Sequence, residues 1–181
     1  MSEGAHEIIE FWFNELEPKQ WWIKDIQLDQ QIHKRFGELH RQANQSELVA
    51  WRYSSIGRLA EIIILDQFSR NIYRDTPQAF ASDPLALCLA QHALSHSCQN
   101  DLTDAQRSFL YMPFMHSESA SVHQVAERLF NEPQVSGNKD FEHRHKAIID
   151  RFGRYPHRNQ ILGRESTTDE IEFLKEPGSS F

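Results

Sequence analysis

The sequence predicts a single all-α domain spanning residues 1–181. Three observations favour this class. Apolar residues recur with the 3.6-residue period of an amphipathic helix along most of the chain. Glycine occurs only seven times, and no stretch alternates convincingly between apolar and polar residues as a half-buried strand would. Because the connections between the periodic stretches are short, we expect neighbouring helices to pack as antiparallel hairpins.

The first half of the chain predicts three helices, over residues 8–16, 28–39 and about 56–72. The first should end before Pro18, because proline cannot continue a helix. The run IIIL at residues 62–65 could form a buried strand by itself. It lies inside the helical stripe of the third stretch, however, so we assign it to that helix.

Capping signals mark where helices of the second half begin. Asp83 followed by Pro84 is typical of an N-cap and a first helical position, which opens a helix through Leu94. Capping boxes of the form Thr-x-x-Gln and Thr-x-x-Glu begin at Thr103 and Thr167. These signals predict three further helix starts.

Stop signals and periodicity define the remaining boundaries. Pro113 should kink or stop the helix that follows Thr103. A sixth helix is expected over residues 119–130 and a seventh over residues 141–152, with Gly153 as its C-terminal cap.

Composition and charge narrow the class of partner and the compartment. The formal net charge is −7, which argues against a nucleic-acid binder or a protein that docks on anionic membranes. Two cysteines ten residues apart form no disulfide framework, so we expect a reducing compartment. The N-terminal stretch is acidic, unlike a signal peptide, and no apolar run approaches the length of a membrane span. We therefore expect a cytoplasmic protein.

The third predicted helix carries the first candidate site. It is apolar on nearly all sides, so we expect it to be central and Asp66 to be at least partly buried. A buried carboxylate needs a cation or several donors. Arg70 lies at i+4, and Gln67 and Asn71 add polar groups at the same end of the helix. This pattern fits a structural ion pair as well as it fits a ligand site.

A second candidate lies in YMPFMHSE, residues 111–118. His116 and Glu118 could face a shared cavity as an acid/base pair. Alternatively, Glu118 only favours the start of the next helix, and Ser117 or Ser119 caps that helix.

The segment RFGRYPHRNQILGR, residues 151–164, contains four arginines and no acid. The planar guanidinium suits carboxylates and phosphates, so these arginines either pair with buried acids such as Asp66 and Glu118 or hold an anionic ligand. Arg151 should lie on the exposed face of its helix.

Counting charges favours an anion in this segment. Three arginines remain (Arg154, Arg158 and Arg164), and Asp66 already has Arg70 as a neighbour. We therefore expect at least one of the three to point into a cavity and bind an anion, because an unpaired buried guanidinium is costly.

Two other patterns favour structure over chemistry. His145 lies on an apolar helix face, where a histidine is more often a satisfied core residue than a catalyst. Cys88, His92 and His96 have zinc-compatible spacing on one helix, but they share a solvated face with no obvious fourth ligand. We expect no metal and no cofactor.

Three long motifs resemble a bacterial family of uncharacterised proteins, the domain-of-unknown-function family 924. They are LDQFSRN at 65–71, PFMHSE at 113–118 and RFGRYPHRNQILGREST at 151–167. FWF at 11–13 and AFASDPLA at 79–86 are also similar, so the resemblance covers nearly the whole chain. Tyr155 stands where the family usually has phenylalanine.

The resemblance implies a tetratricopeptide-like α-α superhelix and implies no activity. The family's recurring polar positions match twelve residues of this chain: Asp66, Gln67, Arg70, Asn71, His116, Ser117, Glu118, Arg154, His157, Arg158, Asn159 and Arg164.

These motifs are far apart in the sequence, and we expect them to converge on one internal pocket that binds a small polar or anionic molecule. Acid/base catalysis would then use Asp66, His116, Glu118 and His157, and the other eight positions would bind the ligand. The alternative is a helical scaffold for a protein partner, in which the polar motifs are a structural lock between hairpins.

Overall fold

The computed structural model describes residues 2–180, and every regular element within them is helical. The longer helices are α1 (Glu3–Glu10), α2 (Ile26–Asn44), α3 (Ser55–Ile63), α6 (Asp83–Ser95), α7 (Asp104–Met115), α8 (Ala120–Phe130) and α9 (Lys139–Phe152). Three short helices are α4 (Ser69–Ile72), α5 (Gln78–Ala81) and α10 (Thr168–Phe173). Short 3-10 turns link them at Pro18–Trp21, Val49–Tyr53, Cys98–Asp101, Pro133–Asn138 and Pro156–Arg158. The predicted all-α class is confirmed.

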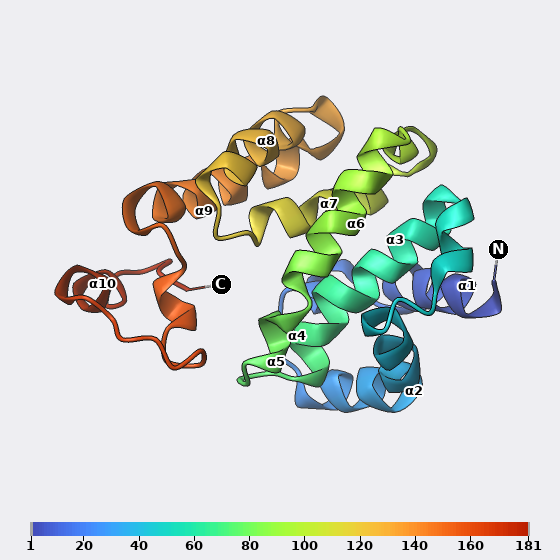
Figure 1. Ribbon diagram of the computed structural model, residues 1–181, viewed down its shortest axis with the longest axis horizontal. Helices are drawn as coiled ribbons and strands as arrows, with labels where there is room; N and C mark the ends of the chain where they lie inside the picture. The colour runs from blue at the N-terminus through green and yellow to red at the C-terminus, as the bar shows by residue number, and fades with distance from the viewer. Residues whose placement is uncertain (1, 181) are drawn as a thin grey trace.

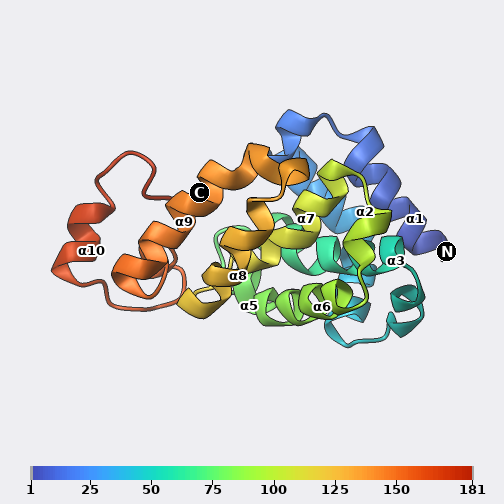
Figure 2. The ribbon, with the colours of Figure 1, turned by 90° about the horizontal axis from the view of Figure 1, so that it is seen from above.

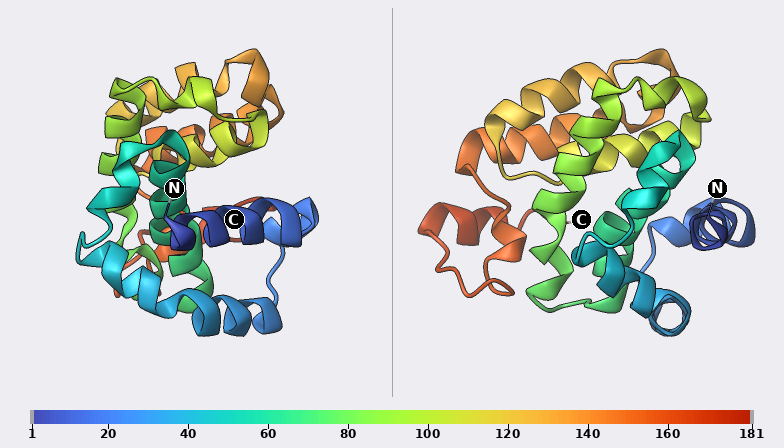
Figure 3. Two further views of the ribbon diagram at one scale, coloured as in Figure 1. Left: turned by 90° about the vertical axis from the view of Figure 1, so that its right-hand side faces the viewer. Right: turned by 45° about the vertical axis from the view of Figure 1, so that its right-hand side comes forward.

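The predicted third helix is a continuous central rod. It consists of α3, a π-helical segment at Ile64–Phe68 and α4, and it packs against α1, α2, α6 and α7. The IIIL run lies inside this rod and is fully buried. In Figures 1 and 3, α2 and the α8–α9 hairpin lie on opposite sides of the rod.

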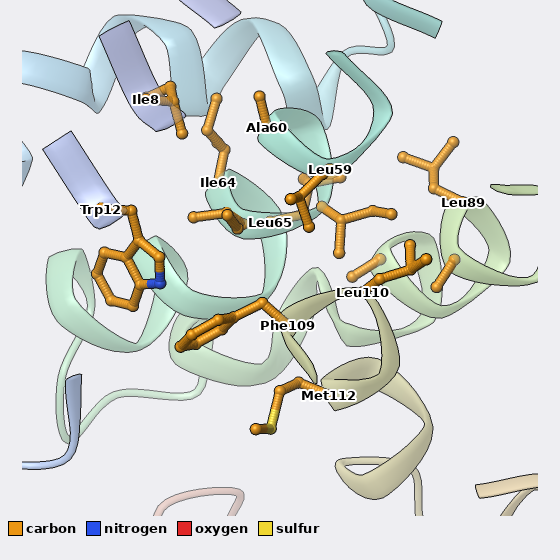
Figure 4. Close-up of a cluster of buried hydrophobic side chains, with 14 of the residues drawn as sticks. Ile8, Trp12, Leu59, Ala60, Ile64, Leu65, Leu89, Phe109, Leu110 and Met112 are labelled. Atoms are coloured by element: carbon orange, nitrogen blue, oxygen red, sulfur yellow. The ribbon is translucent and has the colours of Figure 1, made fainter. Parts of the chain in front are cut away.

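Aromatic side chains fill the main core around the rod. The Trp12 and Phe109 rings meet edge to face with centroids 5.6 Å apart, beside Leu65 of the rod (Figure 4). Each buried aromatic side chain of this kind contributes on the order of 1.5–3 kcal/mol to stability. This packing fixes the rod, and with it Asp66, in the centre of the molecule.

The C-terminal part of the chain has a small core of its own. Ile148, Ile149 and Tyr155 are buried there, and Phe152 and Phe173 pack against them. Figures 1 and 2 show α9 and α10 at the end of the molecule opposite the N-terminus. The arginine-rich segment 151–164 therefore bridges this small core and the central helices.

Several predicted boundaries are confirmed. Side chains form capping boxes at Thr103 and Thr167, and Gly153 ends α9 with a left-handed φ of 70°. The first helix begins earlier than predicted, at Glu3, because Ser2 caps it through the amide of Ala5. A π-helical turn then carries it to Glu15, close to the predicted end.

Two expectations about helix ends need correction. Pro113 does not stop α7, which continues to Met115. The proline removes only one backbone hydrogen bond near the helix end, and its neighbours Leu110 and Phe114 are buried. Asp83 is the first residue of α6 and does not cap it; Ser82 precedes the helix, and the carboxylate of Asp83 binds arginines.

Within residues 2–180, none of the helices combines the length and apolar character that crossing a lipid bilayer requires.

Candidate functional site

Asp66 and His116 form the centre of the candidate site. Asp66 lies in the π-helical segment of the rod and is 1% exposed. Its Oδ1 accepts a hydrogen bond from His116 Nδ1 at 2.7 Å, and its Oδ2 accepts one from Gln67 Nε2 at 2.6 Å. π-helical segments within α-helices often occur at functional sites. The predicted contact between the first two motifs is therefore present.

Charge keeps Asp66 ionised despite its burial. Burial alone would raise the pKa of Asp66, but His116 and Arg70 outweigh it and hold this pKa below its usual range. Because the ionised carboxylate accepts from Nδ1, Nε2 is the ring nitrogen of His116 that remains for another partner. No residue within 2–180 bonds to Nε2, and the His116 side chain is 16% exposed.

Asp83 links two arginines beside this pair. Arg70 donates to both carboxylate oxygens of Asp83, at 2.9 and 3.0 Å, and to the backbone oxygen of Asp66 at 2.6 Å. Arg158 donates to Asp83 Oδ2 at 3.2 Å and to the carbonyl of His116 at 3.1 Å. The four side chains Asp66, Asp83, Arg70 and Arg158 thus carry balanced charge.

Arg158 is the most buried arginine of the loop. Its guanidinium carbon lies 4.6 Å from the ring centroids of both Phe80 and Tyr155. Burial, and then the nearby charge of Arg70, lower its pKa. The Nε–H of Arg158 is buried and has no hydrogen-bond partner among residues 2–180. A buried donor of this kind is costly unless a bound group satisfies it.

Glu118 belongs to a second cluster and does not contact His116. Arg164 donates to both of its oxygens at 2.7 and 2.9 Å, and the backbone N–H of Tyr155 donates to Oε1 at 2.7 Å. Burial alone would raise the pKa of Glu118, but the hydrogen bonds from Arg164 and Tyr155 lower it. Glu118 therefore fixes the start of the arginine loop.

The remaining loop arginine pairs with α10. Arg154 donates to the two oxygens of Glu170 at 2.7 and 2.8 Å. Asn159 joins both pairs, because its Oδ1 accepts from Arg164 at 2.9 Å and its Nδ2 donates to Glu170 at 3.3 Å. These contacts hold the loop as one hydrogen-bonded unit.

The charge count made from the sequence was therefore wrong. Arg154, Arg158 and Arg164 each contact a carboxylate, because Glu170 and Asp83 supply acids that the count left out. Both acids stand at helix starts and were interpreted only as capping residues. The motif AFASDPLA contains both Phe80 and Asp83. It was the sequence signal that could have identified Asp83 as a partner of the arginines.

Three further predicted positions make other contacts. Asn71 donates to Asp29 at 2.8 Å in a separate cluster with Arg74. Ser117 accepts from the backbone N–H of Ser119, so it stabilises the turn before α8. The ring of His157 lies 5.6 Å from that of Tyr155. Burial first, and then Arg158, lower the pKa of His157 to about 4.

The sequence analysis missed a buried pair formed by a histidine and a glutamate. His123 and Glu142 are both 0% exposed, and His123 Nδ1 lies 2.8 Å from Glu142 Oε1. His123 Nε2 lies 2.8 Å from the carbonyl of Ser117. Both ring nitrogens of His123 thus lie within hydrogen-bonding distance of an oxygen. This geometry is typical of a structural connection between α8 and α9.

Tyr155 is the residue through which these clusters meet. Its hydroxyl donates to the carbonyl of Met115 at 2.5 Å and lies 3.1 Å from His123 Nε2. A phenylalanine at this position would make neither contact. The ring of His145, which is buried as predicted, lies 5.7 Å from that of Tyr155.

The cysteine–histidine pattern on α6 makes local contacts. Cys88 is exposed, the rings of His92 and His96 lie 4.4 Å apart, and Arg58 is 2.7 Å from His92 Nδ1. Across residues 2–180, no group of three or more His, Cys, Asp or Glu has the arrangement of a metal site.

Comparison with known proteins places this geometry in a family. A solved structure of a protein of unknown function from Agrobacterium tumefaciens is similar, with a TM-score of 0.90 and 37% sequence identity, and the match covers 94% of this chain and 96% of that one. A search of curated proteins gives no match. Residues 8–178 match the family described as "Bacterial protein of unknown function (DUF924)". This chain therefore belongs to the domain-of-unknown-function family 924.

Proposed function

We propose that His116 and Arg158 bind a small polar or anionic molecule, with His116 as the proton acceptor. The observation that carries this proposal is the contact between buried Asp66 and His116 Nδ1, which leaves Nε2 without a partner in the described chain. An imidazole oriented in this way by a carboxylate is suited to general base catalysis.

Arg158 supplies the anion-binding group in this proposal. Its Nε–H has no acceptor among residues 2–180, and its guanidinium lies against the rings of Phe80 and Tyr155. A bound carboxylate or phosphate would provide the missing acceptor and a charge-assisted hydrogen bond. The remaining loop residues, Glu118 among them, then hold Arg158 in place. His157 is a second candidate for proton transfer, because its lowered pKa keeps the ring neutral at pH 7.

A second candidate function is a helical scaffold for a protein partner, built as a tetratricopeptide-like superhelix. The observation in its favour is the number of two-pronged ion pairs. Arg70–Asp83, Arg154–Glu170 and Arg164–Glu118 each use two nitrogens and two oxygens. Such pairs connect helices with fixed geometry, as a structural lock requires.

Ligand-induced stabilisation separates the two functions. Thermal unfolding is measured with phosphate, sulfate, sugar phosphates and small carboxylates, for the wild type, His116→Gln and Arg158→Lys. His33→Gln is the control, because His33 is exposed on α2. At a hundredfold excess over Kd, binding stabilises the fold by about 2.7 kcal/mol.

We expect at least one compound to stabilise the wild type and the control but neither site variant. If no compound stabilises the wild type, or if His116→Gln responds as the wild type does, the binding proposal is wrong. The scaffold alternative then remains.

A further inference from the structure

A groove separate from the Asp66–His116 pair lies along α9. It has a volume of about 290 Å³, and its walls include Arg144, Ile148, Arg151, Phe152, Phe173 and Pro177. A second hollow of about 370 Å³ adjoins it and shares Arg151 and Phe152. Figure 2 shows α9 and α10 at the end of the molecule farthest from the N-terminus. The groove is at the lower limit of the volume that a small ligand needs.

The floor of this groove is apolar. The rings of Phe152 and Phe173 lie 5.0 Å apart, and Ile148 is 6% exposed beneath them. Phe152 and Phe173 are only partly buried, so part of each ring contacts solvent. A hydrocarbon chain or ring that covers this floor would remove more apolar surface from water.

Neither arginine side chain of the groove is paired with a carboxylate of residues 2–180. The Arg151 side chain forms no hydrogen bond or ion pair with any residue in 2–180; its guanidinium carbon lies 4.6 Å from the Phe152 ring centroid and 5.7 Å from that of Phe173. Arg144 stacks on Phe141 at 4.8 Å, and its Nε donates only to the backbone oxygen of Asp140 at 3.2 Å. By contrast, Arg154 is bound to Glu170.

The stacked geometry prepares Arg151 for an anion. Its N–H groups lie in the guanidinium plane, so the edge can still donate to a carboxylate when one face covers the rings. No acidic side chain lines this groove; Asp169 and Glu170 line the adjoining hollow, where Glu170 is paired with Arg154. Arg144 is seven residues away on the same helix, roughly 10 Å along the axis, and adds a second positive charge at the other end.

We propose that this groove binds a monocarboxylate with an apolar body. Arg151 donates to the carboxylate through two N–H groups, and the body covers Ile148, Phe152 and Phe173. Inorganic phosphate could satisfy the arginine but would leave the apolar floor exposed, so it should be a poor competitor.

Isothermal titration calorimetry with octanoate, kept below its micelle concentration, tests this site. The wild type should bind one octanoate saturably. Arg151→Gln should bind at least tenfold more weakly and keep its melting temperature, because Arg151 makes no hydrogen bond that the fold requires. Lys146→Gln is the matched control: it removes one charge from the same helix, where Lys146 pairs with Asp150 outside the groove.

Two further measurements define the ligand class. Octanamide, which lacks the charge, should bind at least tenfold more weakly than octanoate, and equimolar phosphate should not displace octanoate. The proposal is overturned if octanoate shows no saturable binding or if octanamide binds equally well. It is also overturned if Lys146→Gln loses as much affinity as Arg151→Gln. His116→Gln should bind octanoate normally, so this result is independent of the function proposed above.

Discussion

Asp66 Oδ1 lies 2.7 Å from His116 Nδ1, although the two residues are 50 positions apart in the sequence. This hydrogen bond connects the central rod to the C-terminal end of α7. It is charge-assisted, and bonds of that kind contribute about 1.5–3 kcal/mol in buried settings. Gln67 and Arg70 also contact the carboxylate of Asp66. Several side chains therefore stabilise this carboxylate, and removing it should affect them to different degrees.

Replacing Asp66 should cost less stability than replacing Asp83. Asp66→Asn is expected to lower the free energy of unfolding by about 1–3 kcal/mol, because Arg70 keeps both oxygens of Asp83. Asp83→Asn should cost about 3–5 kcal/mol, because it leaves Arg70 and Arg158 without that carboxylate. Urea unfolding followed by tryptophan fluorescence measures both. An equal or larger loss for Asp66→Asn would assign the main structural role to Asp66.

The Glu118–Arg164 pair should show measurable coupling. Its side chains are 27% and 24% exposed, and two N–H groups face two oxygens. A double-mutant cycle with Glu118→Gln and Arg164→Gln should give a coupling energy of about 1–2 kcal/mol. The control is Glu172–Lys175, a pair with a 2.6 Å contact but side chains 63% and 64% exposed. Its coupling should stay below about 0.5 kcal/mol. Equal coupling in the two cycles would remove the structural role assigned to Glu118.

Periodicity and caps predicted the helices well, because these signals are local. The Thr103 and Thr167 capping boxes and the Gly153 cap each depend on fewer than five consecutive residues, and all three form as expected. Pro113 shows where local reasoning fails. Its cost is one hydrogen bond near a helix end, and the burial of apolar neighbours outweighs it.

The partners of the arginine loop could not be predicted in the same way. Arg154 binds Glu170 and Arg158 binds Asp83, across 16 and 75 residues respectively. Only the packing of α10 and α6 against the loop brings these acids near. Each acid also stands at a helix start, so the sequence suggested a local capping role for it and hid its tertiary one. Asp66 was easier to interpret, because the apolar helix around it predicts burial and therefore a partner.

Gly153 offers a test of backbone strain without steric contact. Its φ is 70°, and a Cβ added there would meet no atom within 4 Å. Gly153→Ala should therefore lower the free energy of unfolding by about 1–2 kcal/mol through the left-handed backbone alone. Gly137→Ala is the control, because that position is equally open and has no positive φ. It should be neutral or stabilising by up to about 1 kcal/mol. Chemical denaturation of both variants checks this, and equal losses would contradict it.

Buried histidines should make the fold sensitive to mild acid. Burial lowers the pKa of His145 to about 3, although the hydrogen bond to the carbonyl of Phe141 opposes this shift. Burial also lowers the pKa values of His40 and His157 to about 4. The unfolded chain binds protons at these histidines below pH 6.5, whereas the folded chain does not until the pH is near 4 or lower. Stability is thus fully present above pH 6.5 and falls as the pH decreases from 6.5 towards 4.

Each such histidine contributes a slope of up to about 1.4 kcal/mol per pH unit within that window. Urea unfolding at pH 7.5, 6.5, 5.5 and 5.0 measures the slope above the range in which carboxylates such as Glu170 begin to titrate. His145→Gln should reduce the number of protons taken up on unfolding by about one, and so reduce the slope of stability against pH. His143→Gln, on the exposed side of the same helix, should leave the slope unchanged. If the two variants have the same slope, His145 is not held neutral by burial, and the acid sensitivity has another origin.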